Sequence, residues 1–131
     1  METHDITAIR DRFRSLDARA NESLGSFDNS SIGIGRYVPG ASPWERHNNG
    51  DELLIILDGT VDIEVLGEDS SFRATLSEGT LFTVPRGRWH QLTAEAPVHI
   101  LYASPSEDGV ERTRSHPRDA GEQDGMRRPA S

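Results

Sequence analysis

The chain has 131 residues, of which 34% are hydrophobic, and we expect one domain with part of the chain outside its packed core. It contains no cysteine and no lysine, which excludes disulfides, zinc-thiolate sites, thiol nucleophiles and Schiff-base chemistry. The formal net charge of −8 argues against a nucleic-acid partner, because the sequence concentrates no basic face for phosphate. The sequence has neither an apolar run of spanning length nor a signal-peptide core, so we predict no membrane partner and a soluble, cytoplasmic protein.

An amphipathic helix is predicted near the start of the chain. Four apolar side chains recur there at steps of three and four residues: Ile6, Ile9, Phe13 and Leu16. The polar face of this helix has mixed charge, so it is expected to cover the strand-rich region that follows instead of binding a membrane. Residues 21–31 are rich in Ser, Asn, Gly and Asp, which predicts a connection. Residues 1–30 are therefore interpreted as an N-terminal helix and linker.

Short strands are predicted from residue 31 onward. Seven runs are enriched in β-branched and aromatic residues: Ile32–Val38, Leu53–Leu57, Val61–Leu66, Phe72–Leu76, Thr80–Val84, Trp89–Thr93 and Val98–Tyr102. The breaks between them carry turn signals, including a two-residue hairpin signal at Asp58-Gly59 and further signals at residues 67–69 and 78–79. Strands without intervening helices predict an all-β antiparallel sandwich or barrel over residues 31–103.

The C-terminal segment, residues 104–131, is predicted to be a largely disordered tail. Its only sizeable apolar residues are Val110 and Met126, among glycines, prolines and mixed charges. Such a segment buries too little apolar surface to offset the entropy lost on ordering.

The polar residues of the strand region predict a metal site. Side chains two apart on a strand share a face, so Glu45 and His47 are expected to point the same way. Glu52 follows on the next strand, on a face shared with leucine and isoleucine, and His90 comes from a third strand. Two imidazoles and one or two carboxylates suit a divalent ion such as Mn, Fe, Ni or Zn.

Each candidate ligand also has a purely structural interpretation. His47 and His90 fit hydrogen-bonded histidines of a barrel rim, although ligation is favoured for both. Glu52 would be a costly buried charge unless it is paired or bound to metal, which favours a functional role. A solvated glutamate paired with arginine explains Glu45 equally well. His99 is interpreted as structural, with a hydrogen bond to a ligand imidazole or a place in the cavity lining as the alternatives.

Two spaced motifs in residues 31–103 resemble those of the cupin superfamily. The first cupin motif has a glycine, two histidines one residue apart, a glutamate and, after six residues, another glycine. Its counterparts here are Gly40, the Glu45/His47 pair, Glu52 and Gly59, so a glutamate occupies the first histidine position. A shorter spacing would instead align Arg46 and Asn48, which are poor ligands.

The second motif matches more closely. Gly79, Pro85, Gly87 and His90 have the family spacing, and Ala94 stands where the family usually has asparagine. The resemblance implies a small single-domain cupin, with a jelly-roll barrel that holds a divalent metal at His47, Glu52, His90 and Glu45. Two carboxylates would make this site more negative than the usual cupin site of three histidines and one glutamate.

The resemblance leaves two functional hypotheses open. One is a metal-dependent enzyme of dioxygenase, isomerase or cyclase type, and the other is a non-catalytic protein that binds or senses a small molecule with a structural metal or none. The resemblance also implies a homodimer formed through barrel edge strands. Five side chains are expected to line the cavity, although alternation alone does not orient them: Arg36, Tyr37, Phe82, Gln91 and Tyr102.

Overall fold

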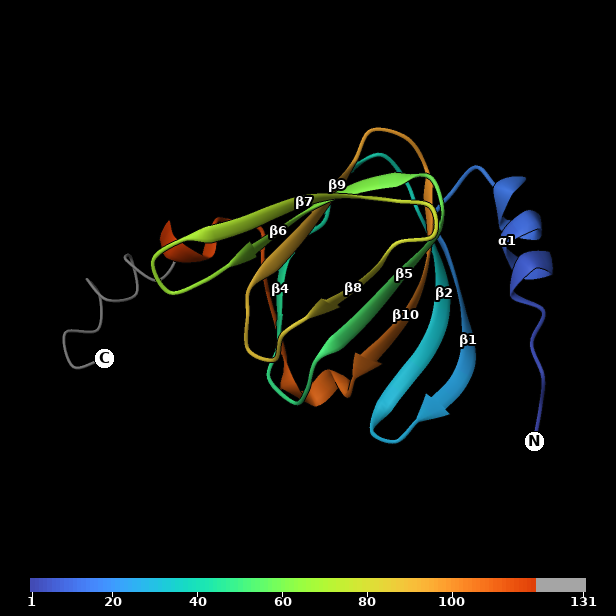
Figure 1. Ribbon diagram of the computed structural model, residues 1–131, viewed down its shortest axis with the longest axis horizontal. Helices are drawn as coiled ribbons and strands as arrows, with labels where there is room; N and C mark the ends of the chain where they lie inside the picture. Colours follow the sequence, from blue (N-terminus) through green and yellow to red (C-terminus); the bar gives the residue numbers. More distant parts are fainter. Residues whose placement is uncertain (120–131) are drawn as a thin grey trace.

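The computed structural model describes residues 1–119, which include two antiparallel sheets, an N-terminal α-helix and a 3-10 helix, η1 (Glu107–Gly109) (Figure 1). One sheet has the order β1-β2-β10-β5-β8, and the other has the order β11-β4-β9-β6-β7 with β3 paired to β9. The strands of the first sheet are β1 (Ala20–Phe27), β2 (Ser30–Tyr37), β5 (Glu52–Asp58), β8 (Leu81–Val84) and β10 (Val98–Pro105). Those of the second are β3 (Gly40–Ala41), β4 (Trp44–His47), β6 (Thr60–Leu66), β7 (Ser71–Ser77), β9 (His90–Ala94) and β11 (Val110–Thr113).

The core lies between the two sheets and follows from strand alternation. On β6, Val61, Ile63 and Val65 are buried, and on β5 the buried residues are Glu52, Leu54 and Ile56. Every second side chain of the facing strands thus points into the interior, as expected for a two-layer β fold. Ten buried residues form this cluster: Leu54, Ile56, Val61, Ile63, Val65, Leu76, Val84, Ala94, Val98 and Ile100.

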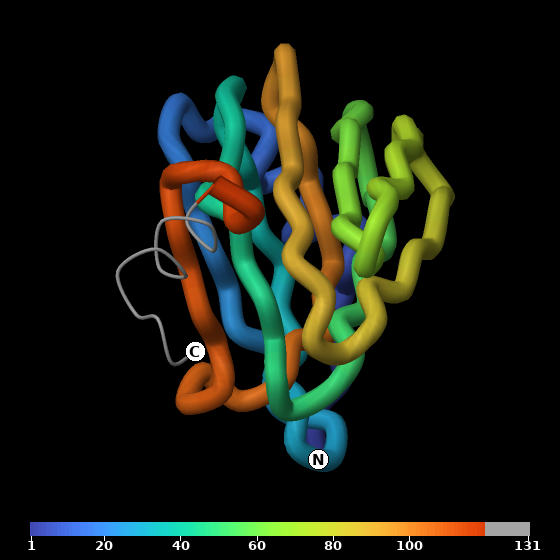
Figure 2. The backbone as a smooth tube through the Cα atoms, turned by 90° about the vertical axis from the view of Figure 1, so that its left-hand side faces the viewer, coloured from blue at the N-terminus to red at the C-terminus, as the bar shows by residue number. Residues whose placement is uncertain are grey.

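The Asp58-Gly59 turn differs from the hairpin that the sequence predicts. It links β5 in one sheet to β6 in the other, and Figure 2 shows the chain passing between the two layers. Gly59 has a φ of 87°, and a Cβ there would lie 2.8 Å from the carbonyl oxygen of Pro97. Glycine is therefore needed at this crossing for conformation and for space. The signal at residues 67–69 does form a hairpin, because Leu66 pairs with Ser71.

Helix α1 (Ile6–Arg14) packs on the outside of the first sheet, beside β1 and β2 (Figure 1). The Asp5 side chain caps it by accepting a hydrogen bond from the backbone N–H of Ala8. Ile9 and Phe13 are buried against Ile34 of β2, as the amphipathic pattern predicts, whereas Ile6 and Leu16, the other two residues of that pattern, are exposed and Leu16 lies beyond the end of the helix. No helix within residues 1–119 is both long enough and apolar enough to cross a membrane.

A charged cluster attaches the helix to the sheet beneath it. Arg14 donates a hydrogen bond to Asp58, whose Oδ2 lies 3.2 Å from Nδ1 of His99. The Nη1 of the buried Arg36 lies 3.1 Å from His99 Nε2, which therefore accepts, so that Nδ1 carries the proton, although Nδ1 makes no hydrogen bond to Asp58 or to any other group within residues 1–119. His99 is thus structural, as predicted, and it lies outside the cavity.

We expect Asp58→Asn to destabilise the protein by about 1 kcal/mol at pH 7, because a charge-assisted hydrogen bond in a partly exposed place is lost. Burial raises the pKa of Asp58, but the hydrogen bond and charge of Arg14, with a smaller contribution from His99, lower it overall. The unfolded state therefore binds more protons than the folded state at acidic pH. The stabilisation by the Asp58 carboxylate is complete above about pH 4 and is lost as the pH falls through the pKa of Asp58 in the folded state.

Urea unfolding of the wild type and Asp58→Asn between pH 3 and 7 checks this prediction. The stability difference between the two proteins should shrink as the pH falls below about 4. Asp69→Asn in the exposed β6–β7 turn is the matched control and should follow the wild type. A difference that stays constant across the range would show that the carboxylate charge of Asp58 does not stabilise the fold.

Two segments are ordered where the sequence predicts otherwise. The prediction of a connection over residues 21–31 is wrong, because β1 pairs with β2 as a hairpin there. The predicted tail does not begin at residue 104, since β10 continues to Pro105 and β11 pairs with β4. In both cases backbone pairing with a neighbouring strand supplies the order that side-chain composition does not predict. The rest of the predicted tail, residues 120–131, lies outside the described residues.

Candidate metal centre

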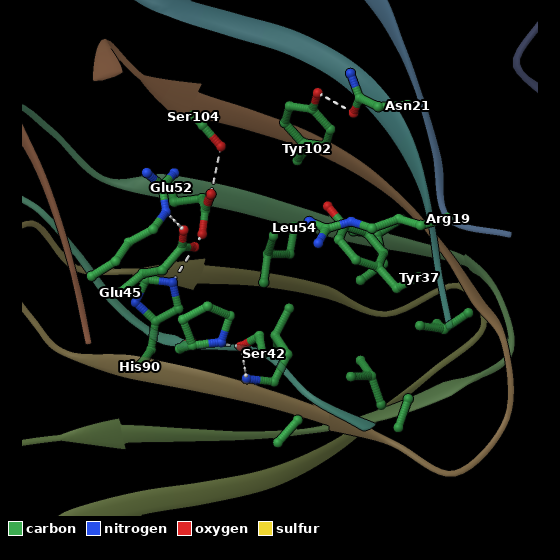
Figure 3. Close-up of a pocket in the computed structure, with 18 of the residues that line it drawn as sticks. Arg19, Asn21, Tyr37, Ser42, Glu45, Glu52, Leu54, His90, Tyr102 and Ser104 are labelled. Atoms are coloured by element: carbon green, nitrogen blue, oxygen red, sulfur yellow. Dashed lines mark hydrogen bonds and ion pairs between the residues drawn. The ribbon is translucent and has the colours of Figure 1, made fainter. Parts of the chain in front are cut away.

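The four predicted ligands come from three strands and line one cavity, and Figure 3 shows Glu45, Glu52 and His90 close together at one end of it. Glu45 and His47 are two residues apart on β4, and Glu52 begins β5 after a tight turn. His90 begins β9 directly opposite Glu45 in the antiparallel pair. The alternation that the sequence predicts therefore places these side chains in the same cavity.

Glu52 lies between the two imidazoles. His90 Nε2 is 3.2 Å from Glu52 Oε1, and His47 Nε2 is 3.3 Å from Glu52 Oε2. The two rings are stacked, with centroids 5.4 Å apart. One ligand atom from each of Glu45, His47 and His90 lies within 4.8 Å of the others. The span of a single coordination shell thus holds Glu45, His47 and His90, and Glu52, which is not part of that three-residue group, lies 3.2 and 3.3 Å from the two imidazoles.

The cluster is buried and incompletely hydrogen-bonded. His47, Glu52 and His90 retain only 5%, 8% and 2% of their accessible surface. Both ring nitrogens of His47 lack a hydrogen-bond partner within residues 1–119, because its ion-pair distance to Glu52 does not have hydrogen-bond geometry. Buried polar atoms are nearly always paired, so two unpaired nitrogens on one imidazole require an explanation.

Glu52 is held as a carboxylate. Burial alone would raise its pKa, but interaction with the His47 and His90 imidazoles, whose Nε2 atoms lie 3.3 and 3.2 Å from its oxygens, outweighs burial and lowers the pKa well below the usual range. For His47, burial acts to lower the pKa of the imidazole, and the Glu52 and Glu45 carboxylates raise it overall. The negative charge of the cluster therefore favours a cation at its centre, whether a proton on His47 or a metal ion.

Neighbouring groups orient three of the four side chains. His90 Nδ1 lies 3.2 Å from the carbonyl oxygen of Arg88, to which it donates, and this tautomer turns the Nε2 lone pair toward Glu52. The Ser104 hydroxyl donates to Glu52, and the Arg112 guanidinium donates to Glu45. The pairing with Arg112 agrees with the interpretation of Glu45 as a glutamate paired with arginine. The proximity of Glu45 to both histidines agrees with its interpretation as a metal ligand.

The sequence analysis missed Ser104 and Arg112. Ser104 shares a strand face with Ile100 and Tyr102, so extending the β10 alternation by two residues would have identified it. Arg112 lies on β11, in the segment predicted as tail, and no local signal identifies it. Its position depends on pairing with Glu45 across a long sequence separation.

The residues present fit a divalent metal ion. Ligand atoms bound at about 2.1 Å in tetrahedral or octahedral geometry lie roughly 3.0–3.4 Å from their neighbours. The two distances from Glu52 oxygens to imidazole nitrogens, 3.2 and 3.3 Å, fall in this range. An ion would also provide the partner that His47 Nε2 lacks.

The cluster opens into a cavity of about 460 Å³, a volume typical of small-molecule sites. Tyr37 and Tyr102 line it, as expected from the sequence. The other three residues expected there do not: Arg36 lies under the helix, Phe82 stacks on Phe72, and Gln91 donates to the Ser42 carbonyl. Leu54, Val98 and Ile100 form part of the apolar wall.

Comparison with known proteins identifies the class. The family model described as cupin domain matches residues 33–104, more than half of the chain, and the chain belongs to this family. No curated protein sequence matches it. The family, the fold and the matched range agree with the expectation of a cupin barrel over residues 31–103.

Solved structures share the fold at low sequence identity. A cupin-2 domain containing protein from Shewanella frigidimarina has a TM-score of 0.58 and 21% identity, over 75% of this chain and 92% of that one. An oxalate oxidase has a TM-score of 0.58 and 17% identity, over 73% of this chain, which spans only 56% of the oxidase. Hydroquinone 1,2-dioxygenase from Sphingomonas, solved with 4-hydroxybenzoate, has a TM-score of 0.55 and 20% identity over 64% of each chain.

Proposed function

We propose that this protein binds a divalent first-row transition metal through His47, Glu52, His90 and Glu45, and a small molecule in the adjoining cavity. The observation that carries the proposal is the buried His47 imidazole, which has no hydrogen-bond partner within residues 1–119 and lies beside a buried carboxylate. Nitrogen and carboxylate ligands suit Mn, Fe, Ni and Zn, and the two carboxylates favour the harder ions of this group.

The favoured activity is that of a metal-dependent enzyme on a small oxygen-bearing compound. When bound, the ion would supply Lewis-acid chemistry, or oxygen activation if it is iron. The residues of the chain would then hold the reacting molecule in a cavity with an apolar wall, and Ser104 and Arg112 would fix the carboxylates by hydrogen bonds. Two enzymes with this fold, an oxalate oxidase and a hydroquinone dioxygenase, make oxidation the first reaction class to assay.

A non-catalytic binding protein is the second candidate. The same cavity would hold a small molecule without turnover, and the metal would be structural or absent. The hydrogen bond from Arg112 favours this candidate, because it partly neutralises Glu45 without an ion.

Metal analysis separates these candidates. Protein purified without added metal, and again after incubation with Fe(II), Mn(II), Ni(II) or Zn(II), should contain close to one ion per chain for at least one of these metals. If no metal approaches this stoichiometry, the enzyme candidate fails. If the loaded protein consumes oxygen or converts a diketone, flavonoid-like or sugar-acid compound, the non-catalytic candidate fails.

A homodimer through the β7 and β8 edges is also proposed. These strands end their sheets in the described part of the chain, and they carry the exposed side chains of Phe72 and Leu81, at 53% and 59% of full exposure. Open edges with apolar side chains favour pairing between copies. Light scattering should give twice the chain mass, and a double substitution Phe72→Glu and Leu81→Glu should give the monomer mass; a monomeric wild type would contradict the proposal.

A further inference from the structure

Two tyrosine rings form one wall of the cavity, at the end away from Glu52 and His90 in Figure 3. They occupy space that two glycines of β2 leave free. A Cβ at Gly33 would lie 2.3 Å from the Tyr102 hydroxyl oxygen, and a Cβ at Gly35 would lie 2.8 Å from the Tyr37 ring. Glycine at both positions therefore lets the rings lie close to the sheet and leaves the cavity open above them.

Arg19, immediately before β1, lies at this aromatic end. Its guanidinium carbon is 5.4 Å from the centroid of the Tyr37 ring, and Arg19 lines the cavity (Figure 3). Within residues 1–119, Arg19 makes no ion pair and no side-chain hydrogen bond, so its N–H donors have no protein acceptor there. Arg112, in contrast, is paired with both Glu45 and Glu107.

The charge at the rim favours an anion. Arg114, immediately after β11, also lines the cavity and has no ion pair within the described residues, so two cations of the lining lack carboxylate partners there. At the opposite end, the negative charges of Glu45 and Glu52 would repel the carboxylate of a ligand unless a metal ion is bound. A carboxylate is therefore favoured beside Arg19, where a guanidinium forms two parallel charge-assisted hydrogen bonds.

Part of the cavity lining is apolar. Leu54, Val61, Leu92, Val98 and Ile100 line it, and all five belong to the main hydrophobic cluster or pack against it. A ligand that uses the whole cavity consequently needs a charged end, a compact apolar body and an oxygen atom at the far end. These three requirements describe a small organic acid with a second oxygen function.

We propose that the cavity binds a small organic acid whose carboxylate pairs with Arg19 and whose body lies on the Tyr37 and Tyr102 rings. The inference rests on the proposed function only for the far oxygen, which would face the metal. The contact with Arg19 needs no ion, so it can be tested with and without metal.

Calorimetric titration with matched acids and amides tests this inference. The probes are phenylacetate and 4-hydroxyphenylacetate with their amides, each added to Mn(II)-loaded and to metal-free protein. We expect the wild type to bind at least one acid about tenfold or more tightly than its amide, since a hydrogen-bonded charge pair is lost in the amide. Arg19→Gln should abolish this preference, and Arg19→Lys should keep part of it. Arg73→Gln, an exposed arginine on β7, is the charge-matched control and should keep all of it.

The outcomes separate this inference from the proposed function. If Arg19→Gln keeps the acid preference, or if the wild type prefers none of the acids to its amide, the inference is wrong. If the protein binds no metal but the metal-free form has an Arg19-dependent preference, the acid site is supported and the metal proposal fails. If metal binds stoichiometrically without such a preference, the metal proposal stands alone.

Discussion

Replacing His90 with glutamine is expected to lower the affinity for the preferred divalent metal by about 100-fold or more. Loss of a group that only orients a ligand typically costs 10- to 100-fold, and the loss of a ligand costs at least as much. Glutamine keeps a polar side chain of similar length but removes the imidazole Nε2 that lies 3.2 Å from Glu52. Titration calorimetry at fixed pH, with elemental analysis of the dialysed protein, measures this effect.

A matched control distinguishes loss of a ligand from loss of any histidine. His4→Gln changes a histidine outside the cavity, before helix α1, and should retain wild-type metal content. Circular dichroism of His90→Gln should show the wild-type β spectrum, which excludes unfolding as the cause. Full metal content in a folded His90→Gln protein would remove this residue from the site.

Replacing Ile56 with alanine is expected to destabilise the fold by roughly 2–5 kcal/mol. Ile56 is 1% exposed on β5 and belongs to the cluster between the sheets. The substitution removes buried methyl and methylene groups from a place where both layers already pack closely, so the surroundings can relax only in part. Ile56 does not line the cavity, so a change in stability does not report on ligand binding. Urea unfolding followed by tryptophan fluorescence measures the effect.

The neighbouring residue on the same strand provides the comparison. Ile55 points to the opposite face of the sheet and is only partly buried. Ile55→Ala should therefore cost clearly less free energy of unfolding than Ile56→Ala. Equal losses for the two substitutions would mean that the core does not lie between the sheets.

The sequence predicts much of the fold because the central strands carry their own signal. All seven predicted runs overlap observed strands, and the alternation on β5 and β6 correctly gives their buried faces. Two of the four edge strands, β1 and β11, behave differently from β7 and β8. β1 has no buried residue, so it lacks apolar alternation, and β11 has four residues that pair with a strand distant in sequence. Their order comes from partners that local patterns do not identify.

The candidate site is predictable to a similar extent. Strand parity and the two cupin motifs place Glu45, His47, Glu52 and His90 on faces that line one cavity in the structure, and their role as metal ligands is the proposal made above. The surroundings are harder to predict. Arg36 and Tyr37 are adjacent and must face opposite ways, but only the structure identifies which one enters the cavity. Arg19 lies outside every predicted strand, so no periodicity assigned it a position.

Crystals grown with Mn(II) and measured for anomalous scattering test the central claim most directly. The predicted result is one strong anomalous peak bounded by His47 Nε2, His90 Nε2 and the Glu52 carboxylate, at bonding distance from each. A structure of the manganese-treated protein with no peak among these side chains, or with its peak elsewhere on the molecule, would contradict the claim.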